Sequence, residues 1–309
     1  MGQEVHMSAS QATGSSIYTS NEVVEGLLRE RILAVEQELD ADLIAYRGPI
    51  TYGVDDLIRD ATEELNPKRD RLAMVLETDG GLIEVAERIA KVFRHHYRYV
   101  QFIIPNAAMS AGTVLVMSGD AIWMDYYSVL GPIDPQVPRA GSNTWVPALG
   151  YLEKYDRLIR KSAQGKLTSA ELTFLVEKFD PAELFRYEQE RDLSVTLLKE
   201  WLVNYKFKNW NETETKKKKV TPQMREKRAG EIAAALSKPS MWHTHSRGIS
   251  MHTLRDKLRL KIDDFGEHAA LNAALKAYNK LLTDYLARLR QNLVVHTREK
   301  YEAMQMGEI

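Results

Sequence analysis

Short apolar runs rich in β-forming residues alternate with helical patterns between residues 71 and 135, and the links between them are short. The runs at 71–77, 100–104 and 121–124 predict strands, and apolar residues at helical spacing predict a helix over 82–93. Strands and helices that alternate in this way form right-handed crossovers in a largely parallel sheet. We therefore expect an α/β fold whose functional site lies where the carboxyl ends of the strands meet.

The regions on either side of this core read differently. An amphipathic helix is predicted over 21–43, a strand over 43–46 and a second helix over 55–65. After Gly150 the patterns are helical almost throughout, with predicted helices at 151–163, 169–179, 181–210, 222–236 and 267–302. We expect residues 1–20 to be a disordered leader and 21–150 to be the α/β core. Residues 151–309 are expected to form a mainly helical extension, of which 241–264 returns to the core.

Composition excludes several classes of function. The chain has 42 Lys and Arg residues against 43 Asp and Glu, so no strong charge field favours nucleic acid or anionic lipid. It has no cysteine, which excludes disulfides, thiolate zinc sites and cysteine nucleophiles and fits a reducing compartment. No apolar run approaches the roughly 20 residues of a spanning helix, and the polar first 20 residues lack a signal-peptide pattern. We expect a cytoplasmic protein without a membrane span.

Two motifs at predicted strand ends carry the chemistry. Asp79-Gly80-Gly81 ends the strand predicted over 71–77, and Ser110 lies among small residues after the strand predicted over 100–104. Acyl transfer needs a reachable hydroxyl and backbone N–H donors directed at the oxyanion that forms when the hydroxyl attacks. Ser110 is therefore a candidate nucleophile. A serine at a helix start is also a common N-cap, and two glycines can simply form a tight turn.

A third motif, Val129-Leu130-Gly131-Pro132-Ile133-Asp134-Pro135-Gln136, follows in order after Met109-Ser110-Ala111-Gly112-Thr113. With Asp79-Gly80-Gly81, these motifs resemble the serine dehydrogenase proteinase family, a branch of the Clp protease and crotonase-like superfamily that is related to signal peptide peptidase A. The resemblance implies a superhelical ββα core, Ser110 as nucleophile and assembly into homo-oligomers. It also implies an oxyanion hole made by the backbone N–H groups of Gly81 and Ala111.

The general base is less clearly marked. The Clp protease subunit has its histidine in the loop that here follows Gly131, and no histidine is present there. In the signal peptide peptidase branch a lysine has this role, and Lys154 lies in the corresponding region. Lys154, however, lies nearly opposite the apolar stripe of its predicted helix, as a solvated surface lysine does.

His245 is the other candidate base. It lies in a segment, Trp242 to Ile249, that resembles the family's Trp, His and Ile pattern. Imidazole has a suitable pKa for general-base catalysis, and Asp134 could orient it as the third member of a triad. Both residues also have structural readings, Asp134 as a brace of its own loop and His245 as a hydrogen-bonding partner. We rank His245 above Lys154. The pair His243 and His245 without a third ligand is weak support for a metal site.

The leading hypothesis is a serine hydrolase that cleaves a peptide or protein substrate without a cofactor or metal. A second is a catalytically inactive oligomeric scaffold, which the missing histidine and the helical extension favour. A third is crotonase-like chemistry on acyl-thioesters, which uses the same oxyanion arrangement. No Gly-x-Gly-x-x-Gly element is present, so no nicotinamide cofactor is expected.

Overall fold

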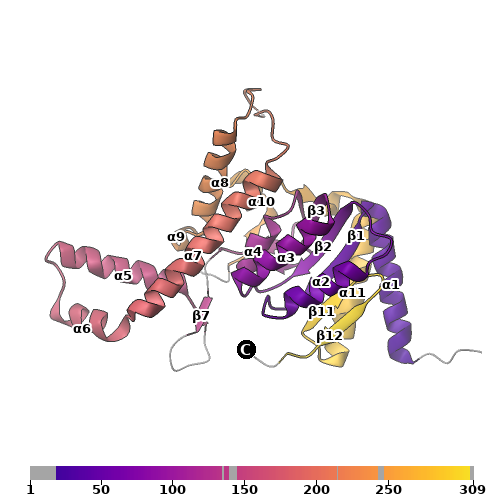
Figure 1. Ribbon diagram of the computed structural model, residues 1–309, viewed down its shortest axis with the longest axis horizontal. Helices are drawn as coiled ribbons and strands as arrows, with labels where there is room; N and C mark the ends of the chain where they lie inside the picture. The colour runs from indigo at the N-terminus through magenta and orange to yellow at the C-terminus, as the bar shows by residue number, and fades with distance from the viewer. Residues whose placement is uncertain (1–18, 134–135, 139–144, 214, 243–246, 307–309) are drawn as a thin grey trace, which may run out of the picture.

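The predicted strands form one twisted sheet with helices on both of its faces. The computed structural model describes residues 19–133, 136–138, 145–213, 215–242 and 247–306. Within these residues the main sheet has seven strands in the order β10-β5-β3-β2-β1-β11-β12 (Figure 1). The α/β fold with a mostly parallel sheet, predicted from the sequence, is confirmed.

Five strands of the main sheet run parallel to one another, because helical crossovers connect them. They are β1 (Asp42–Arg47), β2 (Arg71–Glu77), β3 (Tyr99–Ile103), β5 (Ala121–Met124) and β10 (Asp263–Asp264). In register, Ile44 pairs with Met74, and Met74 pairs with Phe102. Two antiparallel strands, β11 (Leu293–His296) and β12 (Tyr301–Met304), complete the edge beside β1. Strands buried on both faces read as continuous apolar runs, which is why β1 to β3 were recognisable.

Each face of the sheet has its own apolar core. On one face pack α2 (Val54–Glu64), α3 (Ile83–His96) and α4 (Ala111–Val116). On the other pack α1 (Ser20–Leu39) and α11 (Ala269–Leu289), which lie side by side (Figure 1). Phe93 and Phe102 are fully buried in the first core, and Leu28 and Tyr278 in the second. Burial of this kind stabilises by roughly 1.5–3 kcal/mol per large apolar side chain.

A smaller sheet stands at the carboxyl ends of β2 and β3. It contains β4 (Ala107–Ala108), β6 (Val129–Leu130) and β9 (Ile249–Ser250), in that order. β4 and β6 are parallel, and β9 is antiparallel to β6. Before β9 comes α9 (Pro239–Trp242), and α10 (Met251–Asp256) and a short 3-10 helix (Phe265–Glu267) lie on either side of β10.

A helical arm extends away from the sheets. It consists of α5 (Ala148–Ala163), α6 (Ser169–Lys178) and the first half of α7 (Pro181–Trp201), and it projects from the sheet layers in Figure 1. Its helices share a small apolar cluster around Leu149, Leu152 and Leu184. The later part of α7, the π-helix η1 (Leu202–Lys206) and α8 (Pro222–Leu236) pack on the main core. A short hairpin of β7 (Gln136–Pro138) and β8 (Trp145–Pro147) precedes the arm.

Three predicted helices end earlier than expected. The helix predicted over 21–43 ends at Leu39, because Asp40 takes a left-handed conformation (φ 45°). The helix predicted over 267–302 was wrong beyond Leu289, because Arg290 takes a left-handed conformation (φ 55°) that ends α11. The apolar run Leu293–His296 then pairs with β1. The helix predicted over 181–210 ends as an α-helix at Trp201 and continues as the π-helix to Lys206. Isolated sequence patterns do not show that a neighbouring strand offers a free edge.

The antiparallel hairpin of β11 and β12 is tied to the rest of the fold by a buried arginine. Arg298 donates to Glu36 at 2.9 Å and to Asp42 at 2.7 Å, and also to the carbonyl oxygen of Pro67 at 2.6 Å. Both carboxylates are almost fully buried. Removing one member of such a network leaves an uncompensated buried charge, at a cost of about 3–5 kcal/mol. The network therefore fixes the end of the chain to α1 and β1.

The buried histidine of β11 should make stability depend on pH. His296 is 2% exposed, and its Nδ1 lies 2.9 Å from the Tyr278 hydroxyl. Burial lowers the pKa of His296 from 6.5 to about 3. The unfolded chain therefore binds a proton that the folded protein excludes, so this contribution is complete above the unfolded pKa and decreases as the pH falls toward 3. We expect a loss of about 2–3 kcal/mol at about pH 4.5 relative to neutral pH, measured by urea unfolding.

The His296→Phe variant should lose this part of the pH dependence, because phenylalanine does not titrate. His252→Phe, at an exposed position on α10, should keep it. An equal loss of stability in the His296→Phe variant and the unchanged protein on acidification would contradict the prediction.

Candidate active site

The three sequence motifs meet at the carboxyl edge of the main sheet. Beyond β2 the chain continues through Thr78, whose N–H donates to the Ala107 carbonyl oxygen at 2.9 Å and whose carbonyl oxygen accepts from the Met109 N–H at 2.9 Å. On the other side of β4, Ala108 pairs with Leu130 of β6. β4 is therefore hydrogen-bonded to the end of β2 on one side and to β6 on the other, and one motif follows each of these three segments.

Ser110 occupies a strained turn between β4 and α4. Its backbone has φ 50° and ψ −118°, a conformation that is sparsely populated for any residue other than glycine. It stands at the N-cap position of α4, yet its side chain makes no capping hydrogen bond. The capping interpretation is therefore wrong. A serine on a sharp, strained strand-to-helix turn is the geometry of a nucleophile elbow.

The glycine turn, residues 79–81, lies against Ser110. A Cβ atom added to Gly80 would lie 2.7 Å from Ser110 Cβ and 2.8 Å from the Met109 carbonyl oxygen, so only glycine fits there. Gly80 also has φ +105°. A Cβ on Gly81 would lie 2.0 Å from the Ile50 carbonyl oxygen. The backbone of the glycine turn can therefore approach its neighbours this closely only because residues 80 and 81 have no side chains.

Two backbone N–H groups beside this contact have no acceptor among the described residues. Gly81 lies beside Ile50 in an isolated β-bridge, but the two hydrogen bonds of this bridge are made by its neighbours. The Ile50 N–H donates to the Gly80 carbonyl oxygen, and the Leu82 N–H donates to the Ile50 carbonyl oxygen, both at 2.8 Å. In the described part of the chain, neither the Gly81 N–H nor the Ala111 N–H donates to an acceptor. The Ala111 nitrogen would lie 3.4 Å from a Cβ on Gly80.

A buried threonine, to which the sequence analysis assigned no role, locks α4 to the small sheet. Thr113 Oγ1 lies 2.8 Å from the Ala108 carbonyl oxygen and 3.0 Å from that of Gly131, and it accepts from the Gly131 N–H at 2.9 Å. Its side chain is fully buried. The only sequence signal for this role was its position in the Ser110 motif, since a threonine inside a helix is usually unremarkable.

Of the other predicted site residues, only Lys154 lies in the part of the chain that the structure describes. Asp134 and His245 lie outside the described residues. Lys154 is on α5 of the helical arm, and its ammonium lies 5.8 Å from the centroid of the Phe174 ring on α6. In Figure 1 this part of the arm is well separated from α4. The structure therefore brings the glycine turn and Ser110 together but places Lys154 on a different part of the molecule.

Comparison with known proteins bears on the same segment. Residues 55–163 match the family model of the ClpP-like SDH-type serine proteinases. The resemblance predicted from the motifs is confirmed. This ClpP-like segment contains the glycine turn, Ser110 and the Gly131 motif, together with α5.

Two curated relatives come from Methanocaldococcus jannaschii. The uncharacterized protein MJ0137 is 41% identical over 83 residues, which are 27% of this chain and 29% of the relative. The uncharacterized protein MJ1495 is 33% identical over 132 residues, 41% of each chain. The chain thus matches less than half the length of these relatives.

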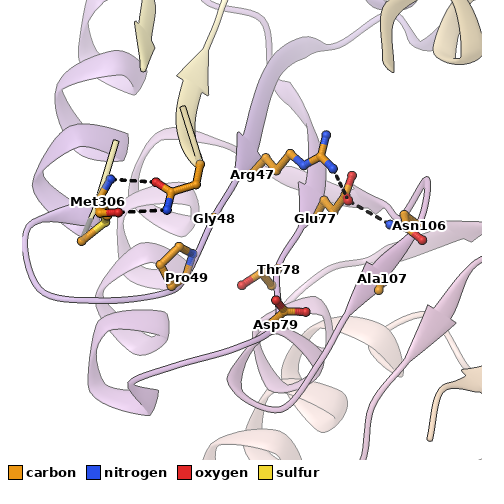
Figure 2. A pocket seen from close by; sticks show the side chains of 10 residues that line it. Arg47, Gly48, Pro49, Glu77, Thr78, Asp79, Asn106, Ala107 and Met306 are labelled. Atoms are coloured by element: carbon orange, nitrogen blue, oxygen red, sulfur yellow. Dashed lines mark hydrogen bonds and ion pairs between the residues drawn. The ribbon is translucent and has the colours of Figure 1, made fainter. Parts of the chain in front are cut away.

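A polar cavity of about 400 Å³ adjoins the glycine turn of the ClpP-like segment (Figure 2). Arg47 forms an ion pair with Glu77 at 3.0 Å, and Asn106 Nδ2 donates to the same carboxylate at 2.8 Å. The exposed side chain of Asp79 lies at the same cavity. The cavity therefore offers a polar, partly acidic recess along the chain that leads to Gly80.

Asn292 and Met306 also line this cavity and are hydrogen-bonded to each other. Asn292 Nδ2 donates to the Met306 carbonyl oxygen at 3.0 Å, and the Met306 N–H donates back to Asn292 Oδ1 at 2.7 Å (Figure 2). Among the described residues, no group of three His, Asp or Glu side chains is arranged to hold a metal ion. No helix in the described ranges combines the length and apolarity needed to cross a bilayer.

The contact between Gly80 and Ser110 can be tested with a matched pair of glycine variants. Gly80 and Gly53 both have positive φ, at +105° and +89°, but a Cβ on Gly53 would meet nothing within 4 Å. Gly53→Ala therefore adds only backbone strain, whereas Gly80→Ala must also displace Ser110 or Met109. We expect Gly80→Ala to lower the free energy of unfolding by about 2 kcal/mol more than Gly53→Ala does, measured by urea unfolding. Equal losses would contradict the close contact between the two turns.

Proposed function

We propose that this chain is a serine peptidase of the ClpP-like type, with Ser110 as its nucleophile. The observation that carries the proposal is the strained backbone of Ser110, held against the glycine turn without a capping role. Strain of this kind costs on the order of 1–3 kcal/mol and clusters at functional sites. A structural serine at a helix start would gain nothing from it.

The chemistry assigns one task to each group. Ser110 Oγ attacks the carbonyl carbon of the scissile peptide bond and passes its proton to a general base. The N–H groups of Gly81 and Ala111 donate to the oxyanion, and the tetrahedral intermediate collapses as the protonated base supplies the leaving amine with its proton. Loss of one such oxyanion donor typically costs about 10²–10³ in kcat. That neither amide has an acceptor in the described residues supports this assignment.

We assign the role of general base to His245, with Asp134 as the residue that orients it. The described residues around His245 support this choice. Trp242 Nε1 donates to the Ala235 carbonyl oxygen at 2.8 Å, and Ile249 pairs with Leu130 of β6. Trp242 and Ile249 are therefore both held in place, and Ile249 pairs with the strand beside the one that leads to Ser110. Lys154 remains the alternative base.

We also propose a homo-oligomer with the superhelical ββα core of the family, acting on peptide or protein substrates in a reducing compartment such as the cytoplasm. Exposed apolar side chains on the helical arm support the oligomer. Val176 is 74% exposed, Phe185 63% and Leu172 52%. Apolar groups gathered on one projecting element are typical of a surface that another subunit covers.

A fluorophosphonate probe tests the nucleophile directly, because it reacts only with an activated serine. The purified chain should be labelled, and Ser110→Ala should abolish labelling, measured by mass spectrometry of the intact protein. Ser162→Ala, at an exposed position on α5, should be labelled as the unchanged chain is. Unchanged labelling of the Ser110→Ala variant would remove Ser110 from the mechanism. Absence of labelling in a folded protein would favour the inactive scaffold.

A second set of variants, assayed with a peptide substrate, identifies the base. His245→Ala should lower kcat/KM by about 10²-fold or more, whereas His243→Ala should leave it nearly unchanged. In the unchanged protein, kcat/KM should rise with pH as the base loses its proton. If Lys154→Met abolishes turnover and His245→Ala does not, the base is the lysine.

A further inference from the structure

A second cavity lies at the opposite edge of the main sheet from Ser110. It has a volume of about 580 Å³, within the usual size of small-molecule sites. Tyr99, Ala121 and Asp263, at the amino ends of β3, β5 and β10, line it together with residues of η1 and the turn that follows. Because these strands are parallel, this amino-end recess and the glycine turn occupy different ends of the sheet.

Cations without a partner among the described residues gather in the amino-end recess. Lys206, Arg259 and Lys261 line it, and none of them forms an ion pair or a hydrogen bond with another described residue. Two acids line it as well. Asp120, however, is already neutralised by Arg94 at 2.7 Å and by Lys208. Arg228 also lines the recess, but it pairs with Glu231 at 2.8 Å and donates to the Leu258 carbonyl oxygen. Within the described chain this leaves three cations without a partner and one carboxylate, that of Asp263, in the lining.

Lys206 is the most informative of these cations. Its side chain is half-buried, and the residue lines the recess. Burial lowers the pKa of Lys206 to about 8, although the nearby carboxylate of Asp263 opposes the shift. Desolvating an ammonium in this way is unfavourable unless an anion compensates it. No described side chain supplies one in direct contact.

The remaining wall of the recess is aromatic. Tyr205, Phe207 and Trp210 line it, and the rings of Phe207 and Trp210 have centroids 5.6 Å apart at 58°. Three consecutive residues at the end of the π-helix, 205–207, line this one cavity. Single π-turns frequently mark functional sites. The guanidinium of Arg94 lies 3.7 Å from the Tyr205 ring centroid and fixes that ring.

We propose that the amino-end recess binds a small aromatic anion, whose ring packs on the aromatic wall and whose phosphate or carboxylate binds Lys206, Arg259 and Lys261. Aromatic wall and cations lie in one cavity, so a ligand with only one of these features would leave the other uncompensated. The Asp263 carboxylate can accept a hydrogen bond from a hydroxyl or amino group of the ligand. This site is independent of Ser110 and of the proposed peptidase activity.

Two anionic probes and one neutral probe test the site on the full chain by isothermal titration calorimetry. Adenosine monophosphate carries a ring and a phosphate, indole-3-acetate carries a ring and a carboxylate, and adenosine lacks the anion. We expect at least one of the two anions to bind. If adenosine monophosphate binds, adenosine should bind at least about tenfold more weakly, because it lacks the phosphate. Binding should weaken as salt is added. Preference for one anion identifies the ligand's acidic group.

Matched variants decide whether binding occurs in the recess. Lys206→Met and Lys261→Ser should each weaken binding by about tenfold or more, and Trp210→Leu should weaken it by removing the aromatic surface. Lys166→Met, at an exposed position on the helical arm, should bind as the unchanged chain does. Lys261 is exposed, so its variant tests the site even if Lys206→Met fails to fold. Failure of both anions to bind at millimolar concentration, or equal binding by all of these variants, would overturn the proposal.

Discussion

The close approach of Gly80 to Ser110 is the constraint on which the candidate active site depends. No Cβ atom fits between the two backbones, because it would lie within 2.8 Å of both Ser110 and Met109. Ser110 holds an unfavourable backbone conformation at this contact, and such strain persists only where the surroundings over-determine it. Two buried threonines make these surroundings rigid. Thr113 bonds α4 to both β4 and the Gly131 turn, and Thr78 bonds the end of β2 to β4.

The rest of the fold holds this contact in place from a distance. β2 is paired on both sides in the middle of the main sheet, so its carboxyl end has little freedom. The C-terminal hairpin closes the edge beside β1, and the buried Arg298 network ties it to α1. Rigid strands therefore carry the site, while the helical arm adds surface. Sites that are built on strands are positioned more precisely than sites that are built on loops.

The two ends of the parallel sheet have different chemical characters. The carboxyl end offers N–H groups without an acceptor in the described chain, beside a strained serine, which suits a carbonyl group that becomes negative during reaction. The amino end offers cations and aromatic rings in a cavity, which suits a stable anion with a planar body. β3 and β5 connect the two ends directly.

Much of the fold was predictable because its signals are local. The bounds of β2, β5 and α8 agree with the sequence patterns residue for residue, since apolar runs and capping residues lie next to the structure they specify. Local signals failed where a distant partner decided the outcome. The run at 293–296 follows a long helical pattern, and only the free edge of β1 makes it a strand. Likewise, nothing in the motif around Ser110 shows that its backbone is strained or that its side chain makes no capping hydrogen bond, because both depend on how β4 and α4 are joined.

By itself, the sequence determined that the chain forms a parallel α/β sheet and that a glycine turn and a small-residue serine motif follow two of its strands. Tertiary structure alone decided that Gly80 touches Ser110, that Ser110 is strained, and that Lys154 belongs to a separate arm. It also assembled the amino-end recess from Tyr99, Lys206 and Lys261, which are far apart in the chain. The physical reason is that propensity and periodicity act over a few neighbouring residues, whereas contacts, strain and cavities arise only when distant segments pack together.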